Sequence, residues 1–199
     1  MIEHGICSED EMILEFLRSE VNSPRFKKKY LDIILRIGHT QQDLVDDADL
    51  SSEVQNAARI KVLGYTRGYK TDELWFRGFP SDIAWRHSTL QSDQLNLLTY
   101  GKSAAWLALS EGTRRAIDGA KNVNRIPIEQ DINRHISTIA KLCKHGEIFP
   151  KLIAVRSPGS SLILVEGHAR ATAYALAGIE KPIELILGSS PSIASWEYY

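Results

Sequence analysis

The segment that decides the fold is Leu162-Ile163-Leu164-Val165-Glu166-Gly167-His168-Ala169-Arg170-Ala171-Thr172-Ala173-Tyr174-Ala175-Leu176-Ala177-Gly178. Its first four residues form an apolar run of the length of a buried strand. Gly167 then removes side-chain bulk where the chain turns, so a ligand can approach the backbone N–H groups closely. The alanine-rich remainder has helical spacing, and Gly178 stands where a helix ends. The segment therefore predicts a strand, a tight turn and a helix in succession.

The turn between this strand and helix is a candidate phosphate site. A helix N-terminus offers unpaired N–H donors and the positive end of the helix dipole. The guanidinium of Arg170 suits two phosphate oxygens, and Gly167, His168 and Thr172 would add further contacts. Glu166 is a candidate Mg²⁺ ligand or general base, and we group it with His168 as the candidate catalytic residues. The residues alone leave an equal alternative, in which Arg170 only covers the protein surface.

Residues 123–190 resemble the ParB/sulfiredoxin superfamily in the order of their segments. These are Ile126-Pro127-Ile128, a helix, Gly146, Phe149-Pro150-Lys151-Leu152-Ile153-Ala154-Val155, a turn, and Leu164-Val165-Glu166-Gly167-His168-Ala169-Arg170. Members of that superfamily bind a nucleotide with the Gly-x-x-Arg turn, and they include chromosome-partitioning CTPases, sulfiredoxins, free-serine kinases and nucleases. The resemblance implies that Gly167, His168 and Arg170 contact the phosphates of ATP or another nucleoside triphosphate, with Mg²⁺ bridging the phosphate oxygens.

Two positions depart from the pattern of that superfamily. His168 stands where sulfiredoxins carry their catalytic cysteine, which argues against sulfinic acid repair. Ala169 stands where relatives usually place His or Arg, so one phosphate contact is either missing or supplied from elsewhere in the chain.

The composition is that of an ordinary globular protein, with 43% hydrophobic and 25% charged residues and a net charge of −1. So small a net charge gives no general attraction to DNA or to an anionic membrane, and a nucleic-acid partner is not favoured. The first residues lack the features of a secretory signal, and no apolar run is long enough to span a bilayer, so we expect a cytoplasmic protein without a membrane partner. Cys7 and Cys143 are far apart, which favours reduced thiols over a disulfide or a zinc site.

The predicted fold class is α+β, with three segments. Residues 1–64 predict a helical N-terminal region with three helices. The first begins at Ser8, the second begins at Ser23, followed by Pro24, and ends at Gly38, and the third begins at Ser51 or Ser52 and ends at Gly64. Residues 65–122 form a mixed aromatic and basic segment, a candidate substrate-side subdomain, with a strand over 83–90 and a helix over 92–109 that Gly101 kinks or divides.

Residues 123–199 predict a ParB/sulfiredoxin-like nucleotide-binding module with a small mixed sheet and helices. Strands are expected at 126–128, 152–155, 162–165 and 183–187, with a turn at Pro158-Gly159. A helix is expected over 132–143, and Gly146 ends it. The aromatic residues at the C-terminus predict a docked tail.

A second candidate anion site is the loop of Thr113, Arg114 and Arg115. Two guanidinium groups and a hydroxyl beside a helix start would suit a substrate or phosphate clamp facing the Gly167 turn. The alternative is an exposed loop that caps a helix. Tyr69 is a further candidate substrate contact, because its aromatic and basic surroundings suit a stacking surface; such aromatics also commonly plug a loop onto a core.

These features predict a nucleotide-binding protein, most concretely an ATP-dependent phosphotransferase (kinase) or nucleotide hydrolase acting on an unidentified small-molecule acceptor. Arg114 or Arg115 would stabilise the transferring group. The alternative is a non-catalytic nucleotide-sensing or DNA-binding ParB-like module, as the partitioning relatives imply. A ParB-like nuclease ranks third, because the acidic residues of a two-metal site are not grouped near Glu166. A homodimer remains open in every case.

Overall fold

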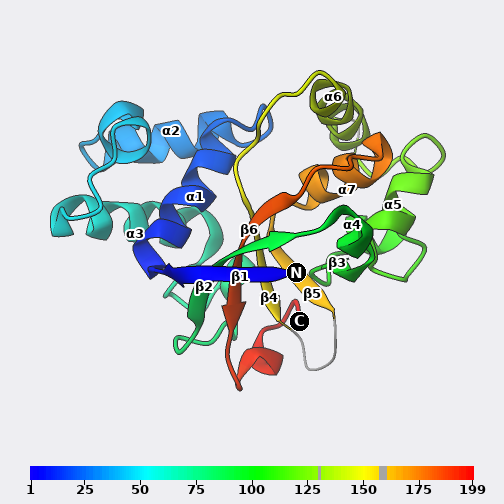
Figure 1. Ribbon diagram of the computed structural model, residues 1–199. Helices are drawn as coiled ribbons and strands as arrows, with labels where there is room; N and C mark the ends of the chain where they lie inside the picture. The colour runs from blue at the N-terminus through cyan, green and yellow to red at the C-terminus, as the bar shows by residue number, and fades with distance from the viewer. Residues whose placement is uncertain (130, 157–160) are drawn as a thin grey trace.

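A single mixed sheet organises the computed structural model, which describes residues 1–129, 131–156 and 161–199. The turn expected at Pro158-Gly159 lies outside these residues. Within them the sheet has the order β1-β2-β6-β4-β5-β3 (Figure 1). Its strands are β1 (Ile2–Cys7), β2 (Ala84–Leu90), β3 (Leu98–Tyr100), β4 (Leu152–Arg156), β5 (Leu162–Glu166) and β6 (Ile183–Ser189). The α+β class is confirmed.

The strands run in both directions. β1, β2 and β6 pair antiparallel, as do β4 and β5, whereas β4 with β6 and β3 with β5 pair parallel. All three segments expected from the sequence therefore contribute strands to one sheet.

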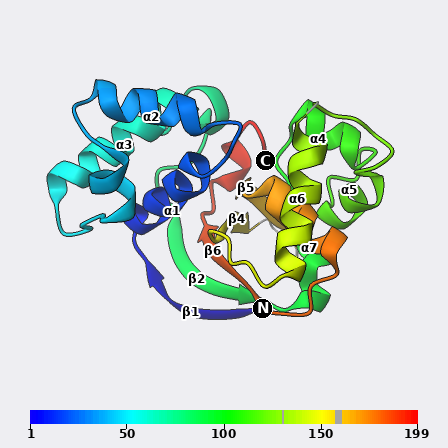
Figure 2. The ribbon, with the colours of Figure 1, turned by 90° about the horizontal axis from the view of Figure 1, so that it is seen from above.

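Helices cover both faces of this sheet. On one side lie α1 (Glu9–Val21), α2 (Lys27–Arg36) and α3 (Glu53–Arg67), and on the other α4 (Ala104–Leu109), α5 (Ala116–Asn122), α6 (Ile132–Lys144) and α7 (His168–Ala177) (Figure 2). Shorter helical turns are η1 (Gln42–Asp46), η2 (Leu74–Phe76), η3 (Ser92–Leu97) and η4 (Ile193–Ser195).

The sheet has a hydrophobic core on each face, and alternate side chains along a strand enter alternate cores. In β4, Ile153 and Val155 pack into the core shared with α1 to α3, while Leu152 and Ala154 pack into the core shared with α7. This is why the strands read as continuous apolar runs: both faces are buried.

Several sequence predictions are confirmed. Ser8 and Glu11 form the predicted capping box at the start of α1. Most of the predicted elements are present with small boundary shifts. They are the helix expected over 132–143, the strands expected at 83–90, 152–155, 162–165 and 183–187, and the strand, glycine turn and helix of 162–178. The C-terminal tail is docked: Trp196 is buried, and its Nε1 donates to the Trp75 carbonyl at 2.7 Å.

Two helix boundaries were predicted wrongly. α2 begins at Lys27, because residues 24–26 form a turn, in which the N–H groups of Phe26 and Lys27 donate to the Ser23 carbonyl. α3 continues through Gly64 to Arg67 and ends at Gly68, which takes the left-handed conformation that glycine tolerates (φ +80°). Gly64 is helical and therefore does not act as a stop.

The helix expected over 92–109 was also wrong. It is divided into η3, strand β3 and α4, because Leu98 and Tyr100 are buried beside β5 as strand residues. The strand expected at 126–128 is absent, since the side chain of Asn133 bonds the backbone of Val123, Ile126 and Ile128 in place of a neighbouring strand.

β1 was not anticipated. Five of its six residues are exposed, so the sequence there carries no apolar alternation, and only pairing with β2 defines the strand. Across the described parts of the chain, no helix is both long enough and apolar enough to cross a bilayer.

Candidate functional site

A cleft of about 760 Å³ lies between the helices on the two sides of the sheet. One wall comes from α1, the α1–α2 turn and Arg67 at the end of α3, and the other from α4 and α6. The end of β5 and the start of α7 line it too, including Glu166, Gly167, His168 and Arg170. A cleft of this size suits a small ligand such as a nucleotide.

Gly167 allows the chain to enter α7 at this cleft. Its φ of +98° lies in the left-handed region, and an added Cβ would lie 2.4 Å from Leu152 Cδ2 and 2.9 Å from Arg170 Nη2. As the N-cap residue it has no side chain to bond the first turn, and its carbonyl accepts from Ala171 N–H at 2.8 Å. The N–H groups of residues 168–170 precede that bond and find no partner in the described parts of the chain, so the helix start has uncapped donors.

Arg170 is held by protein groups on three sides. Its Nη1 donates to Ser19 Oγ, and its Nη2 donates to Glu166 Oε1 at 3.3 Å and to the Lys151 carbonyl at 3.4 Å. Ser19 Oγ in turn donates to Glu166 Oε1 at 2.7 Å. Arg170 Nε is buried and has no partner within the described residues. Glu166 and Arg170 therefore form an ion pair that also joins α7 to α1.

His168 is a neutral imidazole in an aromatic environment. The rings of Trp75, Tyr100 and Trp106 lie 5.3 to 5.8 Å from its own. Burial, together with the positive charges of Arg67, Arg170 and Arg114, lowers the pKa of His168 to about 3. Its Nε2 accepts a bond from Gly101 N–H at 3.3 Å, which places the proton of the neutral ring on Nδ1.

Thr172 lies behind the turn and is absent from the cleft lining. Its side chain is fully buried, where Oγ1 donates to the His168 carbonyl at 2.7 Å and lies 2.6 Å from Tyr100 Oη. It fixes the first turn of α7 and the position of His168.

The facing wall contributes a second buried ion pair. Arg67 donates through Nε to Glu20 Oε1 at 3.0 Å, and its Nη2 makes a further bond to the same oxygen. Burial, and next the charge of Glu166, raises the pKa of Glu20 to about 7, although Arg67 and Arg170 oppose this shift.

Two exposed arginines complete the charged lining. Arg25 pairs with Glu129 at 2.5 Å, and Arg134 lies 3.7 Å from Asp131. Both pairs are solvent-exposed, so they are weak and easily exchanged for another anion.

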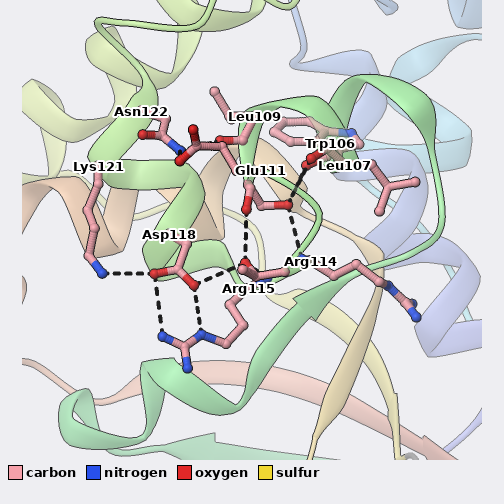
Figure 3. Close-up of polar contacts among 11 residues, drawn as sticks. Trp106, Leu107, Leu109, Glu111, Arg114, Arg115, Asp118, Lys121 and Asn122 are labelled. Atoms are coloured by element: carbon pink, nitrogen blue, oxygen red, sulfur yellow. Dashed lines mark hydrogen bonds and ion pairs between the residues drawn. The ribbon is translucent and has the colours of Figure 1, made fainter.

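The second predicted anion site does not join this cleft. Arg115 makes a two-point bond to Asp118, which also accepts from Lys121 at 2.8 Å and from Thr113 at 3.0 Å (Figure 3). The bond from Lys121, with those from Arg115 and Thr113, lowers the pKa of Asp118 to about 2. This network matches the exposed, helix-capping loop that was the alternative to a phosphate clamp at these residues.

Arg114 and Tyr69 are likewise outside the cleft lining. Arg114 Nε donates to the Tyr100 carbonyl at 2.8 Å, and its Nη2 to the Tyr198 carbonyl at 3.4 Å. Tyr69 is buried against Phe76, and its hydroxyl donates to Glu9 Oε1 at 2.5 Å. Both side chains bond protein groups rather than facing the Gly167 turn.

Sequence reasoning missed the residues of the facing wall, namely Ser19, Glu20 and Arg67. Ser19 and Glu20 read only as the end of a helix, and Arg67 as one basic residue of an aromatic segment. No spacing relates them to Gly167, since residues 19 and 166 meet only through packing of α1 beside the start of α7.

Comparisons with family models, curated proteins and solved structures give no match to this chain. The geometry of the cleft is therefore the basis for assigning a function.

Proposed function

We propose that the cleft binds a nucleoside triphosphate such as ATP, with its phosphates at the Gly167 turn, in the manner implied by the ParB/sulfiredoxin resemblance of residues 123–190. The observation that carries this proposal is the uncapped N-terminus of α7, which opens into the 760 Å³ cleft beside the buried guanidinium of Arg170. Backbone N–H groups and the helix dipole favour phosphate at such a place.

The charge of the lining supports an anionic ligand. Four arginines, Arg25, Arg67, Arg134 and Arg170, face three carboxylates from Glu20, Asp131 and Glu166. The exposed pairs of Arg25 and Arg134 can exchange their carboxylates for phosphate at small cost.

Glu166 is placed to share a magnesium ion with the nucleotide. Its Oε1 accepts from Ser19 and Arg170, and Oε2 has no hydrogen bond to any described residue, which leaves Oε2 for a cation. Mg²⁺ typically takes one or two carboxylates, several waters and the substrate phosphates, so one glutamate is a sufficient protein contribution.

The chemistry that fits this arrangement is phosphoryl transfer to a small acceptor, or hydrolysis of the nucleotide. Such reactions require mainly positioning and charge neutralisation, which the arginines and Mg²⁺ would supply. His168, being neutral, would donate one hydrogen bond from Nδ1 rather than act as a cation. Trp75 and Trp106 line the cleft and offer aromatic surface to a base or an acceptor.

Non-catalytic nucleotide sensing is the second candidate. The bonds of Arg170 to Ser19 and to Glu166 join α1 to the end of β5 and the start of α7 within the cleft. A phosphate that drew Arg170 away from these partners would loosen that connection, which is how a ligand shifts a conformational equilibrium.

Calorimetric titration with ATP, CTP and GTP, with and without Mg²⁺, tests the binding site. We expect Arg170→Gln to weaken binding about 10-fold or more, as expected for loss of a hydrogen bond to a charged group. Arg115→Gln is the matched control, because Arg115 lies outside the cleft lining. Absence of binding to every nucleotide, or equal weakening by the two variants, would refute the proposal.

Phosphorus NMR of the bound nucleotide separates the two candidates. Release of phosphate, or transfer to an added acceptor, supports the enzyme. Tight binding without turnover supports sensing.

A further inference from the structure

A second cluster of side chains, each able to serve as a metal ligand, lies at the other end of α1 from the cleft. Cys7 at the end of β1, Glu11 in the first turn of α1 and His87 in β2 offer a sulfur, an oxygen and a nitrogen that all lie within 4.8 Å of one another. Glu11 and Ser19 are eight residues apart on one helix, which separates the cluster from Ser19 by about 12 Å along α1.

Strand register brings two of these residues together. Cys7 pairs with Trp85 across β1 and β2, and His87 follows Trp85 by two residues. Because side chains alternate along a strand, Trp85 and His87 point to the same face of the sheet, the face that α1 covers.

The capping box orients the third residue. Ser8 N–H donates to Glu11 Oε2 at 2.6 Å, and Ser8 Oγ accepts from Glu11 N–H at 3.1 Å. This leaves Glu11 Oε1, which lies 3.5 Å from His87 Nε2. A carboxylate held through one oxygen is typical of metal sites, where outer hydrogen bonds orient the ligands.

One polar atom of the cluster has no hydrogen-bond partner among the described residues, and the thiol makes only weak bonds. Cys7 is buried, and its Sγ has a weak bond to the Ser8 carbonyl at 3.4 Å. His87 Nδ1 is buried and has no hydrogen-bond partner among the described residues. Burial, followed by the charge of Glu11, raises the pKa of Cys7 to about 12, so the free thiol is unreactive.

We propose that Cys7, Glu11 and His87 bind a zinc-class divalent cation through Sγ, Oε1 and Nε2, with water as a fourth ligand. Tetrahedral zinc separates its nitrogen, oxygen and sulfur ligands by about 3.3 to 3.6 Å. The Nε2 to Oε1 distance of 3.5 Å already meets this, and small side-chain rotations bring the sulfur into place.

The donor set selects the class of metal. A thiolate with an imidazole favours zinc and its neighbours over Mg²⁺ and Ca²⁺, which prefer oxygen ligands throughout. The cation displaces the thiol proton, and the thiolate and the Glu11 carboxylate then balance its two charges. Lys151 lies near enough to lower the pKa of Cys7, but it is paired with Glu184 at 3.6 Å, which reduces its opposition to a cation.

Cobalt substitution tests this site without any nucleotide. Protein freed of affinity tags and metals is titrated with Co²⁺, and the sulfur-to-cobalt charge-transfer absorption reports thiolate coordination. We expect one equivalent to bind, with the absorption lost in Cys7→Ala and retained in Cys143→Ala, the matched control on the other free cysteine. Zinc then displaces the cobalt.

Two further variants keep the test decisive if Cys7→Ala fails to fold. Glu11→Gln preserves the capping box, since glutamine serves there as well, and His87→Gln keeps a polar side chain of similar reach. We expect each to weaken zinc binding by about 100-fold or more, at least as much as loss of an outer hydrogen bond to a ligand. Absence of the absorption, its loss in Cys143→Ala, or unchanged zinc affinity in both variants would overturn the proposal.

Discussion

His168 links the stability of this protein to pH, and substitution by glutamine exposes the linkage. Burial, and next the charges of Arg67, Arg170 and Arg114, lower its pKa from an ordinary 6.5 to about 3. A base with a lowered pKa contributes stability that is complete above pH 6.5 and is lost as the pH falls toward 3. The unfolded chain takes up the proton readily, whereas the folded chain resists it.

The magnitude follows from the size of the shift. One pH unit corresponds to about 1.4 kcal/mol, so the whole shift is worth up to about 5 kcal/mol. Between pH 8 and pH 5 the free energy of unfolding lost through His168 is about 2 kcal/mol. Only the part of the shift that lies between pH 6.5 and pH 5 contributes over this range.

Urea unfolding at several pH values measures this difference. Over that interval the wild type should lose about 2 kcal/mol more than His168→Gln, because all other titrating groups are shared. His145→Gln, which removes an exposed histidine, should follow the wild type. If the wild type and His168→Gln lose the same free energy, His168 is not the buried neutral group described above, and the aromatic environment does not exclude its charge.

Three further substitutions test the packing around the cleft by urea unfolding. Gly167→Ala should lower the free energy of unfolding by more than the roughly 1 to 3 kcal/mol of left-handed backbone strain, because its Cβ would meet Leu152 and Arg170. Gly146→Ala is the control, since its φ of +86° is similar but its surroundings are open, and equal costs for the two variants would contradict the close approach at Gly167. Trp196→Ala should cost about 3 to 5 kcal/mol if the tail is docked, and a cost below 1 kcal/mol would show that it is not. Arg67→Ala should cost up to about 3 kcal/mol more at pH 9, where Glu20 of the wild type is ionised and paired, than at pH 5, where Glu20 is protonated; a cost independent of pH would refute the pairing.

The segments that the sequence predicted well are those whose own residues carry the signal. One example is the apolar run of 162–165, followed by Gly167 and the alanine-rich helix. Each of these features is decided by the neighbouring residues in the chain. The capping box of Ser8 and Glu11 is likewise complete within four residues.

The larger errors arose where a partner distant in sequence decides the structure. Leu98 to Tyr100 have helical spacing with their neighbours, yet pairing with β5 makes them a strand. β1 has almost no apolar pattern, and β2 alone defines it. In both cases hydrogen bonds to another strand outweigh weak local preference.

The candidate site divides in the same way. The sequence by itself determined the turn of Glu166, Gly167, His168 and Arg170, because a strand, a glycine and a helix start fix where those groups stand relative to one another. Only the tertiary structure decided what they face. Packing of α1 against the sheet brings Ser19 to Arg170 and Glu166, and burial among aromatic rings keeps His168 neutral. Charge pairing and desolvation depend on distances across the fold, which no spacing along the chain encodes.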